Sequence, residues 1–304
     1  MMSIIRWRSA ALGLALVRTS QAIPGWSRSG TIVEGNASQF DQTTWEQNLD
    51  HPNATGDFPI TGFDITKAYT TSPQTVDGWA LAVNVTSGIP DADTQNPSNA
   101  SGQVFTGTSI YLTAPADIAA AIGADPDAAA DNTTWKICVT VMTGAPETGA
   151  DSNGACSSLS SQCAADFQDA YADQFAKLQD CYSQPPTPDS CGDALSQANL
   201  TTQQYALDHI NGTEVFVTAS DPHDANDNSA YDSAVKTEWP VLIVWGWNAR
   251  ANVSDSTKPT VQLTCARAND TGDGGGSSGS AASGSHGSAA IAFAVAGLAA
   301  VLVL

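Results

Sequence analysis

The sequence predicts a mainly β fold: a single antiparallel β-sandwich-like domain with a helical insertion pinned by disulfides. Several short segments alternate large apolar residues with polar or small ones, which is the pattern of strands with one buried face. One central segment instead repeats its apolar residues at helical spacing. The chain also holds six cysteines, an even number that suits disulfides in a secreted protein.

The clearest strand lies in residues 78–88 (GWALAVNVTSG), where large apolar residues occupy every second position from Trp79 to Val85. A period of two places these residues on one face of a strand. Asn84 falls on the opposite face and begins an N-x-T sequon, so we expect that face to lie on the outside of a sheet.

Other segments rich in β-branched and aromatic residues predict the remaining strands. The segment 240–247 is apolar on both faces. We therefore expect a central strand covered on both sides, or a strand that passes beneath the helical insertion. The further predicted strands are 103–115, centred on 109–112, then 135–142, 214–219 and 260–266, with weaker signals at 30–34 and 63–69.

The helical insertion is expected at about 156–198. Apolar residues recur at helical spacing between 160 and 182, which predicts a helix of about five or six turns. The stretch SQPPTPDS ends this helix because proline disrupts the hydrogen-bond ladder. A shorter helix is expected at 192–198.

The cysteines predict three disulfides. The chain contains no CxxC pair, which is the spacing typical of zinc ligands. If Cys163 and Cys181 share one helix, they are about 27 Å apart and cannot bond. Local pairings would then pin the ends of the helix, and this is one of fifteen connectivities. The pairings considered are Cys156–Cys163 and Cys181–Cys191, with Cys138–Cys265 joining strands.

The N-terminal residues 1–22 have the features of a secretory signal peptide. They contain Arg6 and Arg8, a short apolar core and a small-x-small cleavage site that ends at Ala22. We therefore expect the mature chain to begin at Ile23 and to enter the secretory pathway.

The C-terminal end has the order of a glycosylphosphatidylinositol (GPI) attachment signal: small residues near Gly276, a Gly/Ser/Ala spacer, and the purely apolar stretch 289–304. This stretch of about sixteen residues is shorter than the about 20 that span a bilayer. We expect residues 23–267 to form the extracellular domain, 268–288 to form a disordered stalk that contains the anchor site, and 289–304 to be removed.

Nine N-x-S/T sequons are spread along the expected mature chain, which predicts a glycosylated surface. Each acceptor asparagine has to face solvent. The sequons begin at Asn36, Asn53, Asn84, Asn99, Asn132, Asn199, Asn211, Asn252 and Asn269.

The charge balance excludes some partners. With 31 acidic and 11 basic residues the formal charge is −20. Such a surface repels nucleic-acid phosphates and anionic lipid headgroups, so binding to nucleic acid and electrostatic docking to a membrane are not expected. Contact with a membrane is expected only through the lipid anchor.

No motif for catalysis or for a cofactor is present. The one G-x-S-x-G match, at 275–279, lies in the low-complexity stalk and not between a strand and a helix. The polar cluster 221–232 offers oxygen ligands for a loose calcium site, but it lacks the glycine and the glutamate that an EF-hand requires. The alternative for this cluster is a plain hydrophilic turn; its weak metal candidates are Asp221, Asp224, Asn226 and Asn228.

Three tryptophans offer a hypothesis about carbohydrate binding. Trp239, Trp245 and Trp247 share one face of the segment around 240–247. On an exposed strand they would form a platform for stacking sugars. The apolar residues around them favour packing in the core instead.

The leader, the sequons and the tail resemble those of GPI-anchored, N-glycosylated cell-surface and cell-wall proteins, most like those of filamentous fungi. The resemblance implies a location on the outer face of the plasma membrane or in the cell wall. We expect a surface glycoprotein with a structural or ligand-binding role, with cell-wall carbohydrate as the candidate ligand. The alternative is a secreted hydrolase of wall polysaccharide that uses an Asp/Glu pair.

Overall fold

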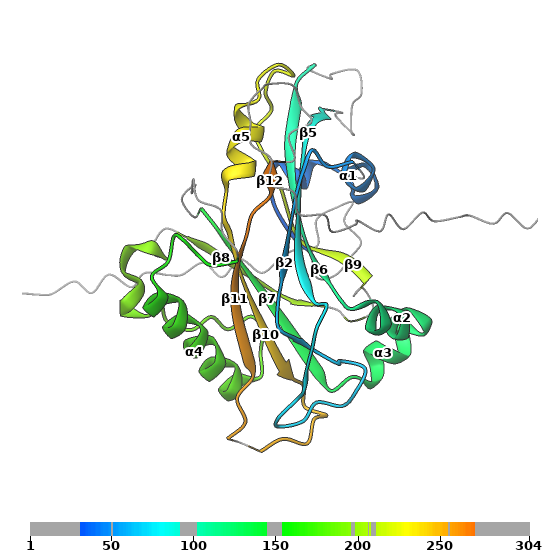
Figure 1. Ribbon diagram of the computed structural model, residues 1–304, viewed down its shortest axis with the longest axis vertical. Helices are drawn as coiled ribbons and strands as arrows, with labels where there is room; N and C mark the ends of the chain where they lie inside the picture. The colour runs from blue at the N-terminus through cyan, green and yellow to red at the C-terminus, as the bar shows by residue number, and fades with distance from the viewer. Residues whose placement is uncertain are drawn as a thin grey trace, which may run out of the picture. The chain divides into compact units, whose positions relative to one another are not determined.

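The computed structural model describes residues 31–49, 51–91, 102–144, 154–195, 198–205, 207, 211–254 and 256–270 (Figure 1). All of these residues belong to one compact unit, Met1–Asp273, and a second unit comprises Gly274–Leu304. The predicted leader, the anchor site near Gly276 and the apolar tail lie outside the described residues.

A six-stranded sheet forms one half of the fold. All its neighbouring strands pair antiparallel except β1 and β9, which pair in parallel. In spatial order the strands are β1 (Ile32–Gly35), β9 (Asn211–Ala219), β6 (Val104–Thr113), β5 (Ala80–Pro90), β2 (Ala54–Pro59) and β12 (Asn269–Asp270).

A four-stranded antiparallel sheet forms the other half. Its order is β11 (Thr260–Ala266), β10 (Trp239–Trp247), β7 (Trp135–Thr143) and β8 (Asn199–Tyr205). A small two-stranded sheet joins β3 (Gly62–Phe63) to β4 (Thr75–Val76).

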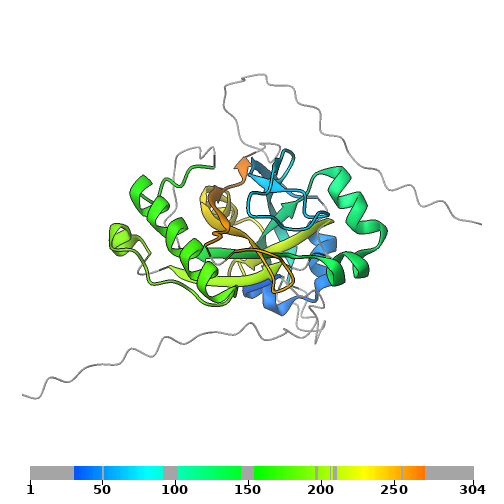
Figure 2. The ribbon, with the colours of Figure 1, turned by 90° about the horizontal axis from the view of Figure 1, so that it is seen from below.

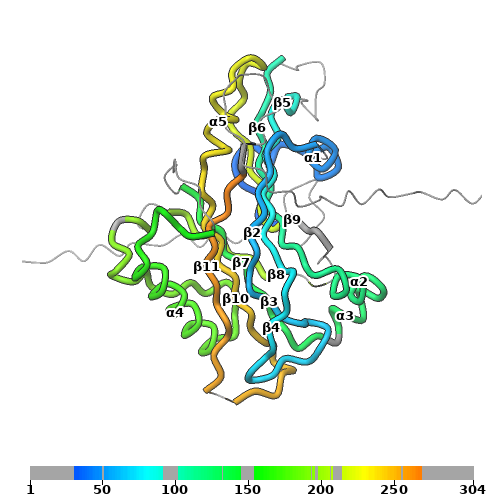
Figure 3. The backbone as a smooth tube through the Cα atoms, in the orientation of Figure 1, coloured from blue at the N-terminus to red at the C-terminus, as the bar shows by residue number. Residues whose placement is uncertain are grey.

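The two large sheets pack face to face around the main core. The rings of Trp79 and Trp245 lie 4.8 Å apart, and those of Phe216 and Trp239 lie 5.0 Å apart, each pair joining one sheet to the other. At one side β11 contacts β2 of the opposite sheet (Figure 3). The chain crosses from one sheet to the other at this point, because Arg267 and Ala268 are the only residues between β11 and β12.

Helices cover the outer faces of both sheets (Figure 2). The long helix α4 (Ser161–Leu178) covers the four-stranded sheet, and α1 (Gln42–Leu49), with the 3-10 helix η1 (Asn36–Gln39), covers the six-stranded sheet. The shorter helices are α2 (Ala116–Ala124), α3 (Pro126–Asn132), α5 (Ser229–Lys236) and the 3-10 helix η3 (Asp189–Ala194). In the described part of the chain, no helix is long and apolar enough to cross a membrane.

Each covering helix places an aromatic ring on a glycine of its sheet. A Cβ atom on Gly246 would lie 2.2 Å from the ring of Phe175 in α4, and one on Gly107 would lie 2.8 Å from the ring of Trp45 in α1. Because these distances exclude any side chain, the two glycines let the helices approach the sheets closely.

Local sequence features account for the start, the buried face and the end of α4. The Ser160 hydroxyl accepts a hydrogen bond from the amide of Cys163 at 3.1 Å and caps the helix start. Phe167, Tyr171 and Phe175 form its buried face. The helix ends at Leu178 because Gln179 adopts the left-handed conformation, with φ of 50°.

The predicted fold class is confirmed: the domain is mainly β, rich in antiparallel pairs, with three disulfides. The segment 240–247 is confirmed as a covered central strand, since β10 lies between β11 and β7 and also beneath α4. The other confident strand predictions correspond to β5, β6, β7, β9 and β11.

Several elements differ from the prediction. The helix predicted to 182 stops at Leu178, and the helix predicted at 192–198 is the earlier η3, followed by the unpredicted strand β8. The weak strand at 63–69 is limited to Gly62–Phe63, because a turn follows. The strand β2 and the helices α1, α2, α3 and α5 were not predicted.

Candidate functional site

The three tryptophans of β10 belong to the core. The exposed fractions of Trp239, Trp245 and Trp247 are 9%, 0% and 2%. Trp245 packs against Phe63 and Trp79, while Trp247 packs against Tyr69 and Phe175. The core interpretation is therefore confirmed, and these rings do not form a surface platform for sugars.

The polar cluster 221–232 forms a turn that leads into α5. The Asp221 carboxylate accepts a hydrogen bond from the side-chain amide of Asn36 at 3.0 Å. The Asp227 carboxylate accepts one from the amide of Ser229 at 2.9 Å, and its contacts with Ser229 lower the pKa of Asp227. The carboxylates of Asp221 and Asp227 thus serve local hydrogen bonds, and Asp224 contributes its backbone carbonyl to the same turn.

One group of His, Cys, Asp and Glu ligand atoms in the described residues is compact enough to hold an ion: Cys156, Glu238 and Cys265, whose atoms lie within 4.8 Å of one another. The two sulfurs are bonded to each other as a disulfide. A disulfide lacks the thiolate that ligates metals, so this group is a covalent cross-link beside a carboxylate.

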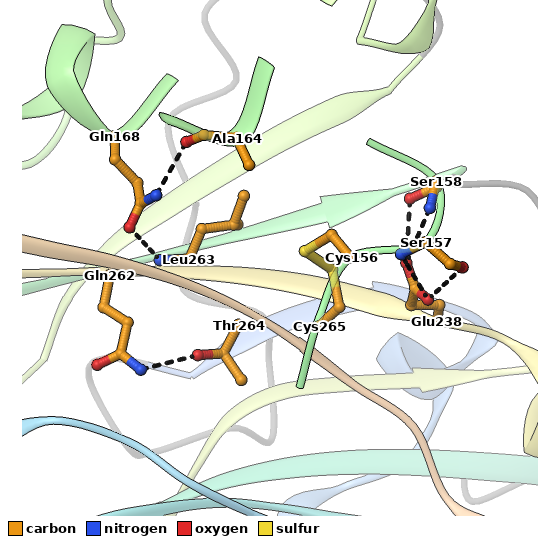
Figure 4. The surroundings of a disulfide bond; sticks show 10 residues. All are labelled: Cys156, Ser157, Ser158, Ala164, Gln168, Glu238, Gln262, Leu263, Thr264 and Cys265. Atoms are coloured by element: carbon orange, nitrogen blue, oxygen red, sulfur yellow. Dashed lines mark hydrogen bonds between the residues drawn. A yellow bond between two sulfur atoms is a disulfide. The ribbon is translucent and has the colours of Figure 1, made fainter. Parts of the chain in front are cut away.

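Glu238 anchors the segment that carries Cys156 (Figure 4). Its side chain is fully buried. It accepts hydrogen bonds from the Ser157 amide at 3.0 Å, from the Ser157 hydroxyl at 2.7 Å and from the Ser158 hydroxyl at 3.1 Å. Several donors offset the cost of burying a carboxylate, so Glu238 fixes this segment to the start of β10.

A second anchor joins α4 to β11 in the same region (Figure 4). The side-chain oxygen of Gln168 accepts a hydrogen bond from the backbone amide of Leu263 at 3.0 Å, and its nitrogen donates to the carbonyl of Ala164 at 2.9 Å. One side chain therefore satisfies an outward amide of the edge strand β11 and holds α4 against it.

The disulfide pairings expected from the sequence are wrong. Cys181 lies beyond the end of α4, so its chain turns back to β7 instead of continuing along the helix axis. Each bond joins segments that lie between 28 and 109 residues apart in the sequence. The observed pairs are Cys138–Cys181, Cys156–Cys265 and Cys163–Cys191.

A polar cluster lies beneath α1, on the outer face of the six-stranded sheet. The Trp45 indole nitrogen donates to the Ser109 hydroxyl at 3.1 Å, and Ser109 and Tyr111 each lie 3.3 Å from the carboxylate of Glu214. Burial, together with the charge of Glu214, raises the pKa of Tyr111 well above its ordinary value. Glu214 is 1% exposed, so it is closed to a substrate in solution.

A cavity of about 340 Å³ lies between the α2–α3 pair and the segment that follows β3. Its buried wall includes Ile65, Ile122 and Leu207, and exposed residues such as Thr66 and Lys67 line its opening. Lys67 forms an ion pair with Asp64 at 2.7 Å. An apolar wall with a polar rim suits a small amphipathic ligand.

The acceptor asparagines differ in their surroundings. Asn53, Asn199 and Asn252 are exposed, whereas Asn36 and Asn84 are half-buried. Asn84 is paired with Thr55 and Ser109 in the six-stranded sheet, on the face opposite Val83 and Val85. Asn99 lies outside the described residues, as do the side chains of Asn132, Asn211 and Asn269.

Sequence reasoning missed Glu214, Glu238 and Gln168. Both glutamates directly precede buried apolar segments, EVFV and EWPVLIVW, and this position was an available signal for a buried carboxylate. Gln168 gave no such signal, because it resembles the other polar residues of α4.

The comparisons add no relative to this geometry: no protein-family model, no curated protein and no solved structure matches this chain.

Proposed function

We propose that this chain is a non-catalytic, GPI-anchored extracellular glycoprotein that displays a rigid β domain at the plasma membrane or cell wall. The observation that carries the proposal is the pairing of all six cysteines into three disulfides. Disulfides persist in oxidising compartments outside the cytosol, which is where the leader and the tail would send the chain.

A structural or binding role is supported by the use of the buried acids. Glu214 and Glu238 are closed to solvent and bonded to neighbouring side chains. A glycosidase instead needs two carboxyl groups about 5 to 10 Å apart on either side of an open cleft. The geometry of Glu214 and Glu238 therefore favours stabilisation of the domain over attack on a polysaccharide.

The cavity beside α2 and α3 is our candidate site for a ligand of this domain. Its volume of about 340 Å³ lies within the usual range for small-molecule sites. Thr66, Thr133 and Thr134 line the cavity together with apolar side chains, and a sugar ring presents the same mixture of polar and apolar surfaces. Cell-wall carbohydrate is accordingly the candidate ligand.

The anchor is tested on intact cells that express the full chain. Phosphatidylinositol-specific phospholipase C is expected to release the protein, whereas retention after release of a known GPI-anchored control would contradict the proposal.

A glycan array then tests the ligand. Ala129→Trp fills the cavity and is expected to abolish binding, and Lys236→Ala on α5 serves as a surface control.

A further inference from the structure

We propose that the sequons are not equivalent: Asn199 and Asn252 carry N-glycans, whereas Asn36 carries none because folding uses its side-chain amide. This inference rests on the proposed function, since N-glycans are added to chains that enter the secretory pathway. It assigns two modification sites and converts a third apparent site into a structural residue.

Both polar atoms of the Asn36 side chain are engaged. Its nitrogen donates to the carbonyl of Ser220 at 2.8 Å and to the carboxylate of Asp221 at 3.0 Å. Its oxygen accepts from the side-chain amide of Gln39 at 2.6 Å. The two hydrogens of the nitrogen therefore account for two bonds to the segment that follows β9.

A glycan on Asn36 is incompatible with these bonds in the folded domain. In the transfer, the asparagine nitrogen attacks the first sugar carbon of a lipid-pyrophosphate-linked oligosaccharide; an N–C bond forms, the C–O bond to pyrophosphate breaks, and the nitrogen loses one proton. A glycosylated Asn36 has one hydrogen on this nitrogen and cannot keep both bonds. The sugar would also need the space beside Ser220 and Asp221.

The position of Asn36 in the fold makes that loss important. Asn36 directly follows β1, which is the edge strand of the six-stranded sheet and pairs in parallel with β9. The bonds to Ser220 and Asp221 join the ends of these two strands across more than 180 residues of sequence. They hold the N-terminal edge strand in register at the point where its backbone pairing stops.

Asn199 and Asn252 have the opposite surroundings. Asn199 begins β8, the edge strand of the four-stranded sheet, and Asn252 lies in the connection between β10 and β11. Both are exposed, and neither side chain makes a hydrogen bond to the described part of the chain. A glycan at either position replaces a hydrogen that faces solvent.

The test is glycopeptide mass spectrometry of the full chain, expressed in a eukaryotic host and isolated from the cell surface. The peptides that contain Asn199 and Asn252 are expected to carry glycans, and the peptide that contains Asn36 is expected to be unmodified. A glycan on most copies of Asn36, or its absence from Asn199 or Asn252 while other sequons are occupied, would overturn the inference. Absence of glycans from all nine sequons would instead overturn the proposed function.

Matched variants separate the structural role from modification. Ser38→Ala destroys the sequon but keeps Asn36, so it is expected to leave the mass of attached glycan unchanged and to lower the melting temperature less than Asn36→Ala does, because it loses only the exposed hydrogen bond from the Ser38 hydroxyl to the Gly35 carbonyl. Asn36→Ala is expected to leave the mass of attached glycan unchanged and to lower the melting temperature by about 2 to 4 °C. Asn252→Gln should remove the mass of one glycan. Loss of a glycan's mass in Ser38→Ala would contradict the assignment even if Asn36→Ala failed to fold.

Discussion

The helices α4 and α1 cover the outer faces of the two sheets in different ways. Both place an aromatic ring on a glycine of the sheet below. The surroundings of α4 contain all three disulfides, one of which starts within the helix at Cys163. By contrast, α1 is held by packing and by the hydrogen bond from Trp45 to Ser109.

The lengths of the two excursions explain this difference. The chain leaves β1 at Gly35 and returns to a strand at Ala54, whereas it leaves β7 at Thr143 and the next strand in the described residues, β8, begins at Asn199. A longer excursion loses more conformational entropy when it is fixed to the sheet. Cross-links reduce that loss by restricting the unfolded chain, so they are most effective around α4.

The largest effect is expected from the cross-link with the longest loop. Replacing Cys156 and Cys265 with alanine opens a loop of 109 residues and is expected to lower the free energy of unfolding by about 5 kcal/mol. The matched change at Cys163 and Cys191 opens 28 residues and should cost about 3.5 kcal/mol. Chemical denaturation checks both values. A larger loss of free energy of unfolding at Cys163 and Cys191 would show that loop length does not determine how much each disulfide stabilises the α4 side.

The cover of the six-stranded sheet is tested at Trp45, whose side chain is fully buried. Trp45→Ala is expected to cost about 4 kcal/mol, because it leaves a cavity above Gly107. Limited proteolysis should then cut α1 before it cuts α4. Trp45→Phe keeps an aromatic ring at this position but removes the hydrogen bond to Ser109, so a smaller cost of about 1 to 2 kcal/mol is expected. Equal protease sensitivity of the two helices would contradict the comparison.

Alkaline pH should destabilise both sides of the fold through buried tyrosines. Burial raises the pKa of Tyr69 to about 12, and burial together with Glu214 raises the pKa of Tyr111. Because both pKa values are higher in the folded state, their contribution to stability is complete below about pH 10 and is lost as the pH rises above it. Urea unfolding from pH 8 to 11 should therefore show a falling free energy above pH 10.

Tyr111→Phe is expected to reduce this alkaline loss on the side covered by α1, and Tyr69→Phe serves as the matched change near the four-stranded sheet. Up to pH 11 the two substitutions should reduce the loss by similar amounts, because both folded-state pKa values lie above that pH. An unchanged pH dependence in both variants would contradict this assignment.

The smallest effect on stability is expected for the ion pair between Asp173 of α4 and Lys258. The Lys258 Nζ atom lies 2.6 Å from the Asp173 Oδ1 atom. Both side chains are at least half exposed, so solvent screens their attraction. Lys258→Ala should leave the free energy of unfolding, measured by chemical denaturation, nearly unchanged. A cost as large as that of losing a disulfide would mean that α4 is held by charge and not by covalent bonds.

Local patterns predicted the strands that carry many large apolar residues. The alternation from Trp79 to Val85 predicted β5, and the doubly apolar VLIVW predicted a covered β10. The strand β8 was not predicted because its residues, NLTTQQY, have little apolar character on either face. The helix α1 escaped because its buried face consists of few residues and includes the polar Gln42.

The disulfides and buried acids depend on tertiary structure. The left-handed turn at Gln179 takes Cys181 off the helix, and a pattern of apolar residues does not reveal such a turn. Cys156 bonds to Cys265, which lies 109 residues further along the chain. Glu238 depends in turn on that bond, because the serines that surround its carboxylate directly follow Cys156.

The passage of the chain from β11 to β12 has a mechanical consequence. A pulling force on the chain beyond Asp270 acts first on β12, which is joined to β2 by only two residue pairs. After these pairs separate, the force reaches Cys265 and passes through its sulfur to Cys156 and the segment fixed by Glu238. Tension therefore extends the domain by only a few residues before a covalent bond shares the load with the strands of the four-stranded sheet.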